Sequence, residues 1–221
     1  MILHADASLI VADKPAGLLA VPGRGPTKAD CLSVRVQAHY PDARVVHRLD
    51  EATSGLMLFA RGAVAQRALS MAFAARVVEK TYVADVAGQP SVPPDEWQLI
   101  DLPVILDWPN RPRSKVDHAI GKPSRTRWRV IAHDALRNTT RLELVPLTGR
   151  SHQVRVHLAA IGHPIVGDPD YGGPEASRLY LHAWQLALPW PSPDHRLVLT
   201  APPPPDFGPP AAAEPCWPSP W

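Results

Sequence analysis

The chain has 221 residues, of which 45% are hydrophobic, and its 23 basic and 21 acidic residues leave a net charge of only +2. This length can bury one substantial core, so a single domain is expected. A charge this close to neutral does not by itself indicate a nucleic-acid partner. Any binding of nucleic acid would have to rely on local basic patches.

Two cysteines, Cys31 and Cys216, cannot form a disulfide framework, and this usage favours a reducing compartment. Asp6, Asp13 and Lys14 interrupt the N-terminal apolar runs before they reach the length of a signal peptide. No stretch approaches the roughly 18 to 20 apolar residues of a membrane span. We therefore expect a soluble cytoplasmic protein with no membrane partner.

Hydrophobic periodicity predicts more strands than helices. Apolar or alternating segments predict strands at residues 9–12, 55–60, 81–86, 125–131 and 141–145. The last two strands are joined by a turn that contains Asn138, which is typical of a meander. Helices are predicted at residues 63–76 and 151–161, the second with Ser151 as N-cap and Gly162 as the stop. Strands and helices do not alternate strictly, so the fold class is α+β with a mostly antiparallel sheet.

Proline is unusually frequent, at 27 residues, and much of the excess lies beyond residue 188. Proline fixes φ and lacks a backbone donor, so a proline-rich segment can join neither a helix nor a central strand. We expect a catalytic domain over residues 1–200 and a disordered tail over residues 201–221.

The most informative polar segment is residues 47–50, His-Arg-Leu-Asp, directly before the predicted strand at 55–60. It offers the carboxylate of Asp50 near the cation of Arg48, at the rim of a sheet where loops carry chemistry. Read alone this is a weak signal, because exposed pairs of Arg and Asp are common.

Several distant segments support a functional role for residues 47–50. Together with residues 53–55, this segment resembles in order and type the RluA family of pseudouridine synthases, as do residues 13–19, 79–82, 148–157 and 162–168. Residues 101–112 are similar to the family member that modifies both ribosomal and transfer RNA. The resemblance covers about residues 1–200. It implies the pseudouridine synthase fold, with a mixed sheet crossed by a catalytic cleft. The few residues before the first predicted strand leave no room for the S4 RNA-binding module that relatives often carry.

The implied reaction breaks the N1–C1' bond of a uridine and forms a C5–C1' bond. No redox step or group donor is needed, so we expect no cofactor and no metal, and the sequence contains no Gly-rich phosphate loop and no His-Glu-x-x-His zinc helix. By resemblance, Asp50 is the catalytic carboxylate, either as nucleophile or as base. Arg155 matches the arginine that keeps this carboxylate charged, although its helical position alone favours a surface arginine. Tyr82 matches the active-site tyrosine, although a half-buried strand tyrosine is also common.

A uridine within folded RNA must leave the base stack before it can react. By resemblance, Arg48 fills the vacated space, and Leu181 packs on the flipped base, although a core leucine describes Leu181 nearly as well. His47 is either structural in the loop or a phosphate contact. The remaining predicted RNA-binding residues are a mixture of aromatic and basic side chains that suits stacking and backbone contact. They are Trp108, Arg111, Arg113 and Lys115, followed by Lys122, Arg125, Arg127 and Arg129 with Trp128 among them.

These residues predict a monomeric RNA pseudouridine synthase that acts on 23S ribosomal RNA and on a transfer RNA anticodon stem-loop. One alternative keeps the reaction and changes the structured RNA. An RNA-binding module without catalysis is the alternative of a different class, and a hydrolase built on Asp50 and Tyr82 is weaker. The exact nucleotide and the route at the sugar are open at this point.

Overall fold

The computed structural model describes residues 2–25 and 28–207, and these form two compact units. The first unit comprises residues up to Lys80 together with His182–Pro202. The second comprises Thr81–Leu181 and the described residues from Pro203 onward. Two strands, β5 (Glu79–Ala87) and β11 (Leu181–Pro189), begin in one unit and continue into the other.

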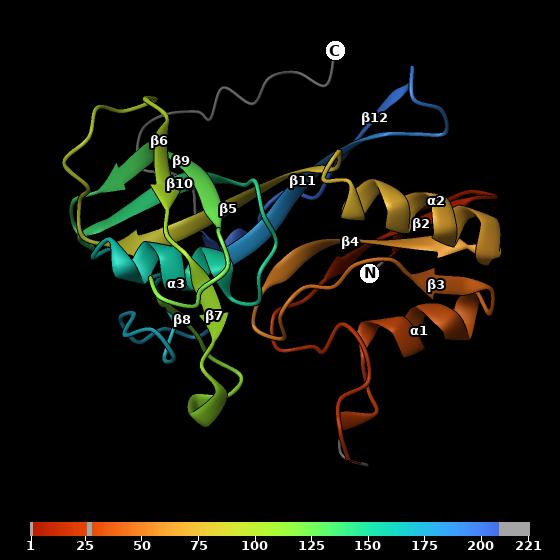
Figure 1. Cartoon of the computed structure of the whole chain (residues 1–221), viewed down its shortest axis with the longest axis horizontal. Coiled ribbons are helices and arrows are strands. Elements are labelled where there is room, and N and C mark those ends of the chain that lie inside the picture. The colour runs from red at the N-terminus through yellow and green to blue at the C-terminus, as the bar shows by residue number, and fades with distance from the viewer. Residues whose placement is uncertain (1, 26–27, 208–221) are drawn as a thin grey trace. The chain divides into compact units, whose positions relative to one another are not determined.

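The first unit is a sheet with two helices (Figure 1). Its further elements are β1 (Ile2–Ala5), β2 (Leu9–Lys14), α1 (Leu32–His39), β3 (Ala43–Val45), β4 (Ser54–Arg61), α2 (Gly62–Ala74) and β12 (Arg196–Thr200). The strand order is β1-β2-β4-β11, with β3 also paired to β4 and β12 to β11. Only the β4–β11 pair among these is parallel.

Strand β4 lies at the centre of this unit and is buried on both faces. Leu56 and Leu58 join one apolar cluster with Leu69 of α2, and Met57 and Phe59 join another cluster that includes Val36 of α1. In a strand that is covered on both faces, no side chain points to solvent, so polar residues do not alternate with apolar ones. This explains why residues 55–60 form a continuous apolar run.

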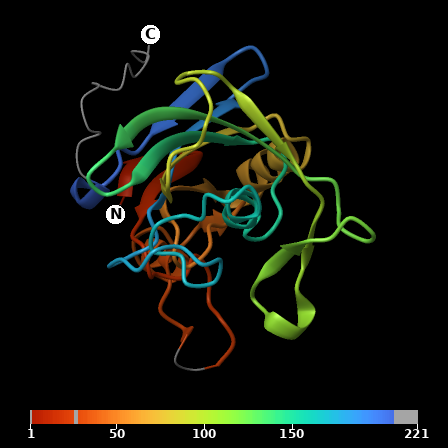
Figure 2. The ribbon, with the colours of Figure 1, turned by 90° about the vertical axis from the view of Figure 1, so that its left-hand side faces the viewer.

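The second unit is an antiparallel sheet with one α-helix and one projecting hairpin. Its elements are β6 (Gln98–Asp101), β7 (Val104–Leu106), a 3₁₀ turn (Trp108–Asn110), β8 (Ser114–Val116), β9 (Arg125–Asp134), β10 (Thr139–Pro146), α3 (Gln153–Ala160) and a second 3₁₀ turn (Pro205–Phe207). The sheet order is β5-β10-β9-β6, and helix α3 packs against β10 and β8. Figure 2 shows the β7–β8 hairpin, in light green, extending away from the strands of this unit.

The predicted α+β class and the mostly antiparallel sheet are confirmed. The predicted strands correspond to β2, β4, β5, β9 and β10, and the turn at Asn138 joins β9 to β10 with a positive φ of 50°. Helix α3 begins at Gln153, two residues later than predicted, after His152 in a left-handed conformation. Helix α1 was not predicted. Within the described residues, no helix is long and apolar enough to cross a membrane.

The first residues of the predicted tail include buried side chains. Ala201 and Phe207 are buried, and the Phe207 ring lies 5.2 Å from that of Tyr180. Proline does prevent strand pairing here, but it does not prevent side chains from packing. The rest of the predicted tail, from residue 208, lies outside the described residues.

Candidate active site

Asp50 ends an irregular segment that leads from β3 to β4. Its side chain is partly exposed, that of Arg48 is exposed, and Leu49 between them is buried. The backbone amide of Thr53 donates to the Asp50 carbonyl at 3.1 Å and forms a turn immediately before β4. The predicted position of Asp50, in a loop at the end of a buried strand, is confirmed.

Lys14 anchors this loop from within the unit. Its side chain is 0% exposed, and Nζ donates to the carbonyl oxygens of Pro15, Leu18 and Glu51 at 3.0, 2.7 and 2.9 Å. The Glu51 carbonyl also accepts from the amide of Gly17. A buried ammonium group needs such acceptors to offset its lost hydration. Lys14 therefore fixes the main chain next to the proposed catalytic carboxylate.

A second set of contacts fixes the start of β4. The Ser54 hydroxyl lies 2.9 Å from Nδ1 of His182, whose Nε2 lies 2.9 Å from the Ala201 carbonyl. Because a carbonyl can only accept, Nε2 carries a proton here, and Nδ1 accepts from Ser54 when the ring is neutral. Gly55 has a φ of 113°, and a Cβ at this position would collide with the main chain of Ala183. The residues after Asp50 are thus held on both sides.

His47 has a structural role in the loop. Its Nε2 accepts from the amide of Leu58 at 2.9 Å, and its ring stacks on Phe73 with centroids 4.5 Å apart. Burial, with the nearby charge of Lys80, lowers the pKa of His47 to about 3. A neutral imidazole with this hydrogen bond favours the first of the two roles considered for it. The predicted substrate-binding role gains no support from these contacts.

Arg155 lies on α3 and is 4% exposed, so the alternative of a surface arginine is wrong. Its Nε and Nη2 donate to the two carboxylate oxygens of Asp168 at 2.7 and 2.6 Å, and Nη2 also contacts Asp170 at 2.7 Å. Nη1 lies against the ring nitrogens of His152 at 3.1 and 3.3 Å. Burial alone would lower the pKa of Arg155, but the hydrogen bonds and charges of Asp168 and Asp170 outweigh it and raise the pKa. The guanidinium is therefore permanently charged and held in one orientation.

Other residues of the 148–157 segment support this helix. The Gln153 side chain accepts from Thr148 and from the amide of Arg150, and it donates to the Arg125 carbonyl and to Thr126. His157 uses one ring nitrogen at Thr126 and the other at the Leu102 carbonyl. These polar residues fix the start of α3. Among them, only Arg155 places a charged group against Asp168 and Asp170.

Tyr82 and Leu181 are both residues of the second unit. Tyr82 is half-buried on β5, where it pairs with Leu144 of β10. Leu181 is buried at the first position of β11. Their proposed contacts with a flipped base stay predictions.

Four of the predicted RNA-binding residues, Trp108, Arg111, Arg113 and Lys115, lie on the β7–β8 hairpin. Trp108 at the tip is 65% exposed, and the guanidinium of Arg111 stacks on it at 4.0 Å from the ring centroid. Arg113 Nε lies 3.3 Å from Asp170, and Lys115 Nζ lies 3.5 Å from Asp117. The segment therefore forms a hairpin with a 3₁₀ turn at its tip. A stacked Arg–Trp pair at its exposed tip suits contact with nucleic acid.

The structure joins Arg155 and Arg113 through a shared partner, Asp170, which the sequence interpretation missed. Asp168 was part of the motif that carries the resemblance, but no role was given to it, nor to Asp170 or Tyr171. The only sequence signal was their position directly after the Gly-His-Pro-Ile-Val-Gly segment. Because Asp50 and Arg155 belong to different units, their pairing stays a prediction.

Comparison with known proteins identifies the family. The sequence model of the RNA pseudouridylate synthase family matches residues 8–160. The chain is 47% identical over 206 residues to the dual-specificity RNA pseudouridine synthase RluA of Escherichia coli strain K12, covering 91% of this chain and 92% of that protein. It is 49% identical over 192 residues to the protein of the same name from Yersinia pestis, covering 85% and 91%.

A solved structure has the same fold. Human RNA Pseudouridylate Synthase Domain Containing 1 superposes with a TM-score of 0.74 at 26% identity, covering 91% of this chain and 82% of that one. The family match includes the Asp50 loop, strand β5 and the Arg155 helix. On this evidence the chain belongs to the RNA pseudouridylate synthase family of isomerases, and its relatives include the RluA proteins.

Proposed function

We propose that this protein isomerises uridine to pseudouridine in ribosomal RNA and in a transfer RNA anticodon stem-loop. The observation that carries the proposal is the identity of 47% along 91% of the chain to a relative named as a dual-specificity enzyme. The fixed Asp50 loop and the buried, permanently charged Arg155 supply the two groups that the reaction needs. The cytoplasm is the compartment that fits such substrates.

In the proposed mechanism, Asp50 acts at the sugar of a uridine that has left the base stack. The N1–C1' bond breaks, the uracil turns, and the C5–C1' bond forms. The proton on C5 is then removed, and N1 gains a proton, so the product is an isomer of the substrate. Asp50 either attacks C1' or removes a proton from the sugar, and in both routes it must be ionised.

Arg155 has the properties that would keep Asp50 ionised. Three of its N–H groups are directed at Asp168 and Asp170, and Nη1 lies against the His152 ring and contacts neither carboxylate. A guanidinium can hold one more oxygen through that remaining nitrogen. We assign this contact to Asp50 in the RNA complex.

Tyr82 and Leu181 are assigned to the two faces of the uracil, where an aromatic ring stacks and an aliphatic side chain packs. Arg48 is exposed in the same loop as Asp50 and is assigned to the space that the uridine vacates. Trp108 and Arg111 offer a stacking surface to the RNA at the hairpin tip.

The proposal is tested by mapping pseudouridines as carbodiimide-dependent reverse-transcription stops in cells with and without the gene. We expect stops in both RNAs to disappear on deletion and to return with the wild-type gene but not with Asp50→Asn. If the stops are unchanged by deletion, the activity is absent in that cell. If they are lost from a different RNA only, the substrate assignment is wrong and the reaction is retained. Return of the stops with Asp50→Asn would exclude Asp50 as the catalytic carboxylate.

A further inference from the structure

The β7–β8 hairpin and the buried Arg155 are linked by two residues that have no role in the mechanism above. Asp170 receives Arg155 Nη2 at 2.7 Å on one oxygen and Arg113 Nε at 3.3 Å on the other. Arg113 Nη2 also reaches the Pro169 carbonyl at 3.5 Å. One carboxylate therefore touches both the hairpin and the guanidinium of α3.

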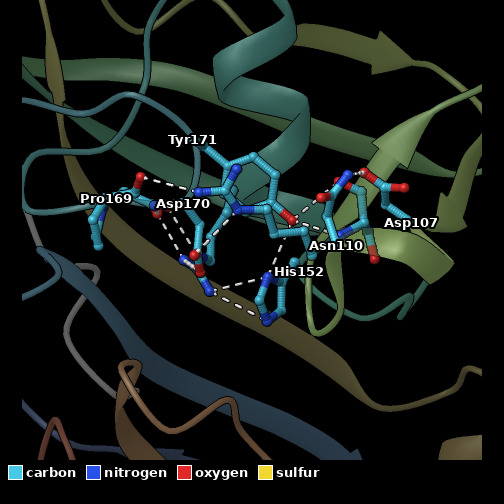
Figure 3. A network of polar contacts seen from close by, with 10 residues as sticks. Asp107, Asn110, His152, Pro169, Asp170 and Tyr171 are labelled. Carbon is cyan, nitrogen blue, oxygen red and sulfur yellow. Dashed lines mark hydrogen bonds and ion pairs between the residues drawn. The ribbon is translucent and has the colours of Figure 1, made fainter.

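Tyr171 makes the second link. Its hydroxyl oxygen accepts from the Ser114 amide at 2.8 Å and lies 3.1 Å from the Ser114 carbonyl, so both main-chain groups of one hairpin residue meet the same phenol. The same hydroxyl lies 3.1 Å from Nδ1 of His152, and Arg155 Cζ lies 5.0 Å from the centre of the Tyr171 ring. Figure 3 shows His152, Asp170 and Tyr171 within one continuous set of polar contacts.

The backbone at His152 adds to this arrangement. Its φ of 54° is unusual for a residue other than glycine, and such conformations persist only where the surroundings hold them. Here the ring is held between Tyr171 and Arg155. The left-handed residue directly before α3 therefore brings a third side chain against the guanidinium.

The two ends of the network differ in strength. The Arg155–Asp168 pair is almost completely buried and bidentate, whereas the side chains of Arg113 and Asp170 are 44% and 31% exposed. Ion pairs near the surface contribute little to stability and exchange partners readily, whereas buried pairs keep their partners. The Arg113–Asp170 pair is therefore the part of these contacts that RNA phosphate can reach and alter.

On the basis of the proposed function, we propose that Asp170 and Tyr171 are positioning residues that connect the RNA-contacting hairpin to the guanidinium of Arg155. Asp170 draws Nη2 toward the hairpin side, and the Tyr171 ring supports the flat face of the guanidinium. The orientation of Nη1, and with it the reach toward Asp50, then depends on how the hairpin is held.

Tyr171→Phe is the first test, because it keeps the ring beside Arg155 and removes only the hydroxyl that meets Ser114 and His152. Tyr180→Phe is the matched control, since Tyr180 is also half-buried in the second unit but packs on Phe207. We expect at least a tenfold loss in the single-turnover rate at saturating stem-loop RNA for Tyr171→Phe and no loss for Tyr180→Phe. Equal rates for the two variants would overturn the role of the hydroxyl.

A double-mutant cycle tests the link through Asp170. Arg113→Ala and Lys115→Ala each remove one positive charge from the same hairpin, but only Arg113 contacts Asp170. In an Asp170→Asn background, we expect Arg113→Ala to cause no further loss in the saturating rate, whereas Lys115→Ala causes the same fold-change in both backgrounds. If the loss caused by Arg113→Ala also multiplies with that of Asp170→Asn, the two residues act independently and the link does not exist.

A readout without RNA separates this proposal from the proposed function. The Nε–H of Arg155 is buried against Asp168, so its exchange with water reports how firmly the guanidinium is held. We expect faster exchange in Tyr171→Phe, Asp170→Asn and Arg113→Ala, measured by NMR on the folded variants, and unchanged exchange in Lys115→Ala. Unchanged exchange in all four variants would overturn the positioning role even if pseudouridine is formed. Faster exchange with no pseudouridine formed by the wild type would instead refute the function and retain the link.

Discussion

Removing the Phe207 side chain should destabilise the second unit, although the residue follows a run of four prolines. Phe207 is 2% exposed, and its ring packs on Tyr180 and lies 5.5 and 5.3 Å from the guanidinium carbons of Arg141 and Arg178. Replacement of a buried phenylalanine by alanine typically costs about 3 to 5 kcal/mol. Because two of the neighbours are arginines, we take the low end, about 3 kcal/mol, for Phe207→Ala.

Deleting the segment should cost more than the point substitution. The Phe207 carbonyl accepts from Arg141 Nη2, and Arg141 also pairs with Asp85 on β5. Loss of a hydrogen bond to a charged group adds about 1.5 to 3 kcal/mol. A chain that ends at Pro202 should therefore be about 5 kcal/mol less stable than one that ends at Phe207. At about 2 to 4 °C per kcal/mol for this length, the difference in melting temperature is roughly 10 to 20 °C.

Thermal unfolding followed by circular dichroism would measure these differences. Phe207→Ala should lower the melting temperature by about 6 to 12 °C. Leu136→Ala is the matched control, because that side chain is 100% exposed and its loss should change stability by no more than about 0.5 kcal/mol. If the chains ending at Pro202 and at Phe207 melt within about 2 °C of each other, Phe207 does not contribute to the core and the disordered tail begins where the sequence predicted it.

Four further outcomes are expected. Arg48→Ala should slow single-turnover isomerisation much more on a folded stem-loop than on a short unstructured RNA with the same bases, because only the stem-loop imposes an unstacking cost. An equal loss of rate on both RNAs would exclude the base-flipping role. Arg155→Ala should lower the free energy of unfolding by about 3 to 5 kcal/mol in chemical denaturation, because it leaves a buried carboxylate unpaired. Arg155→Lys should recover part of that stability but little of the isomerisation rate. Wild-type stability for the alanine variant would contradict the buried pair. Tyr82→Phe should bind RNA normally and rearrange it slowly, and an unimpaired rate would mean that the hydroxyl moves no proton. His47 is neutral in the fold and protonates more readily when unfolded, so its contribution to stability is complete above pH 6.5 and declines by at most about 1.4 kcal/mol per pH unit toward pH 3. His47→Gln should remove that part of the pH dependence in urea titrations between those values.

Much of the first unit could be predicted because its signals are local. The apolar run of β4 and the helical repeat of α2 are each contained in a short window of sequence. Helix α1 was missed because it has eight residues, buries only Leu32, Ser33 and Val36, and begins after Cys31 without a side-chain cap. A helix with so few apolar positions gives no clear hydrophobic periodicity in the sequence. Its packing against β3 stabilises it in the fold.

The candidate site could be predicted only in part for the same reason. The loop position of Asp50 followed from the strand after it, but the burial of Arg155 did not follow from its helix. Its partners, Asp168 and Asp170, come from the segment after α3 and meet it only in the folded unit. The inward orientation of His47 likewise depends on Leu58 and Phe73, which are distant in sequence.

The Lys14 anchor has a consequence for how this sequence can vary. The acceptors that Pro15, Leu18 and Glu51 offer to Lys14 are main-chain carbonyls, and every residue type supplies a carbonyl in the same place. The contribution of Lys14 to the geometry beside Asp50 is therefore nearly independent of the identity of residue 51, whose side chain is exposed. Residue 51 can therefore vary without loosening the loop next to Asp50, because the contact uses the main chain that all residue types share.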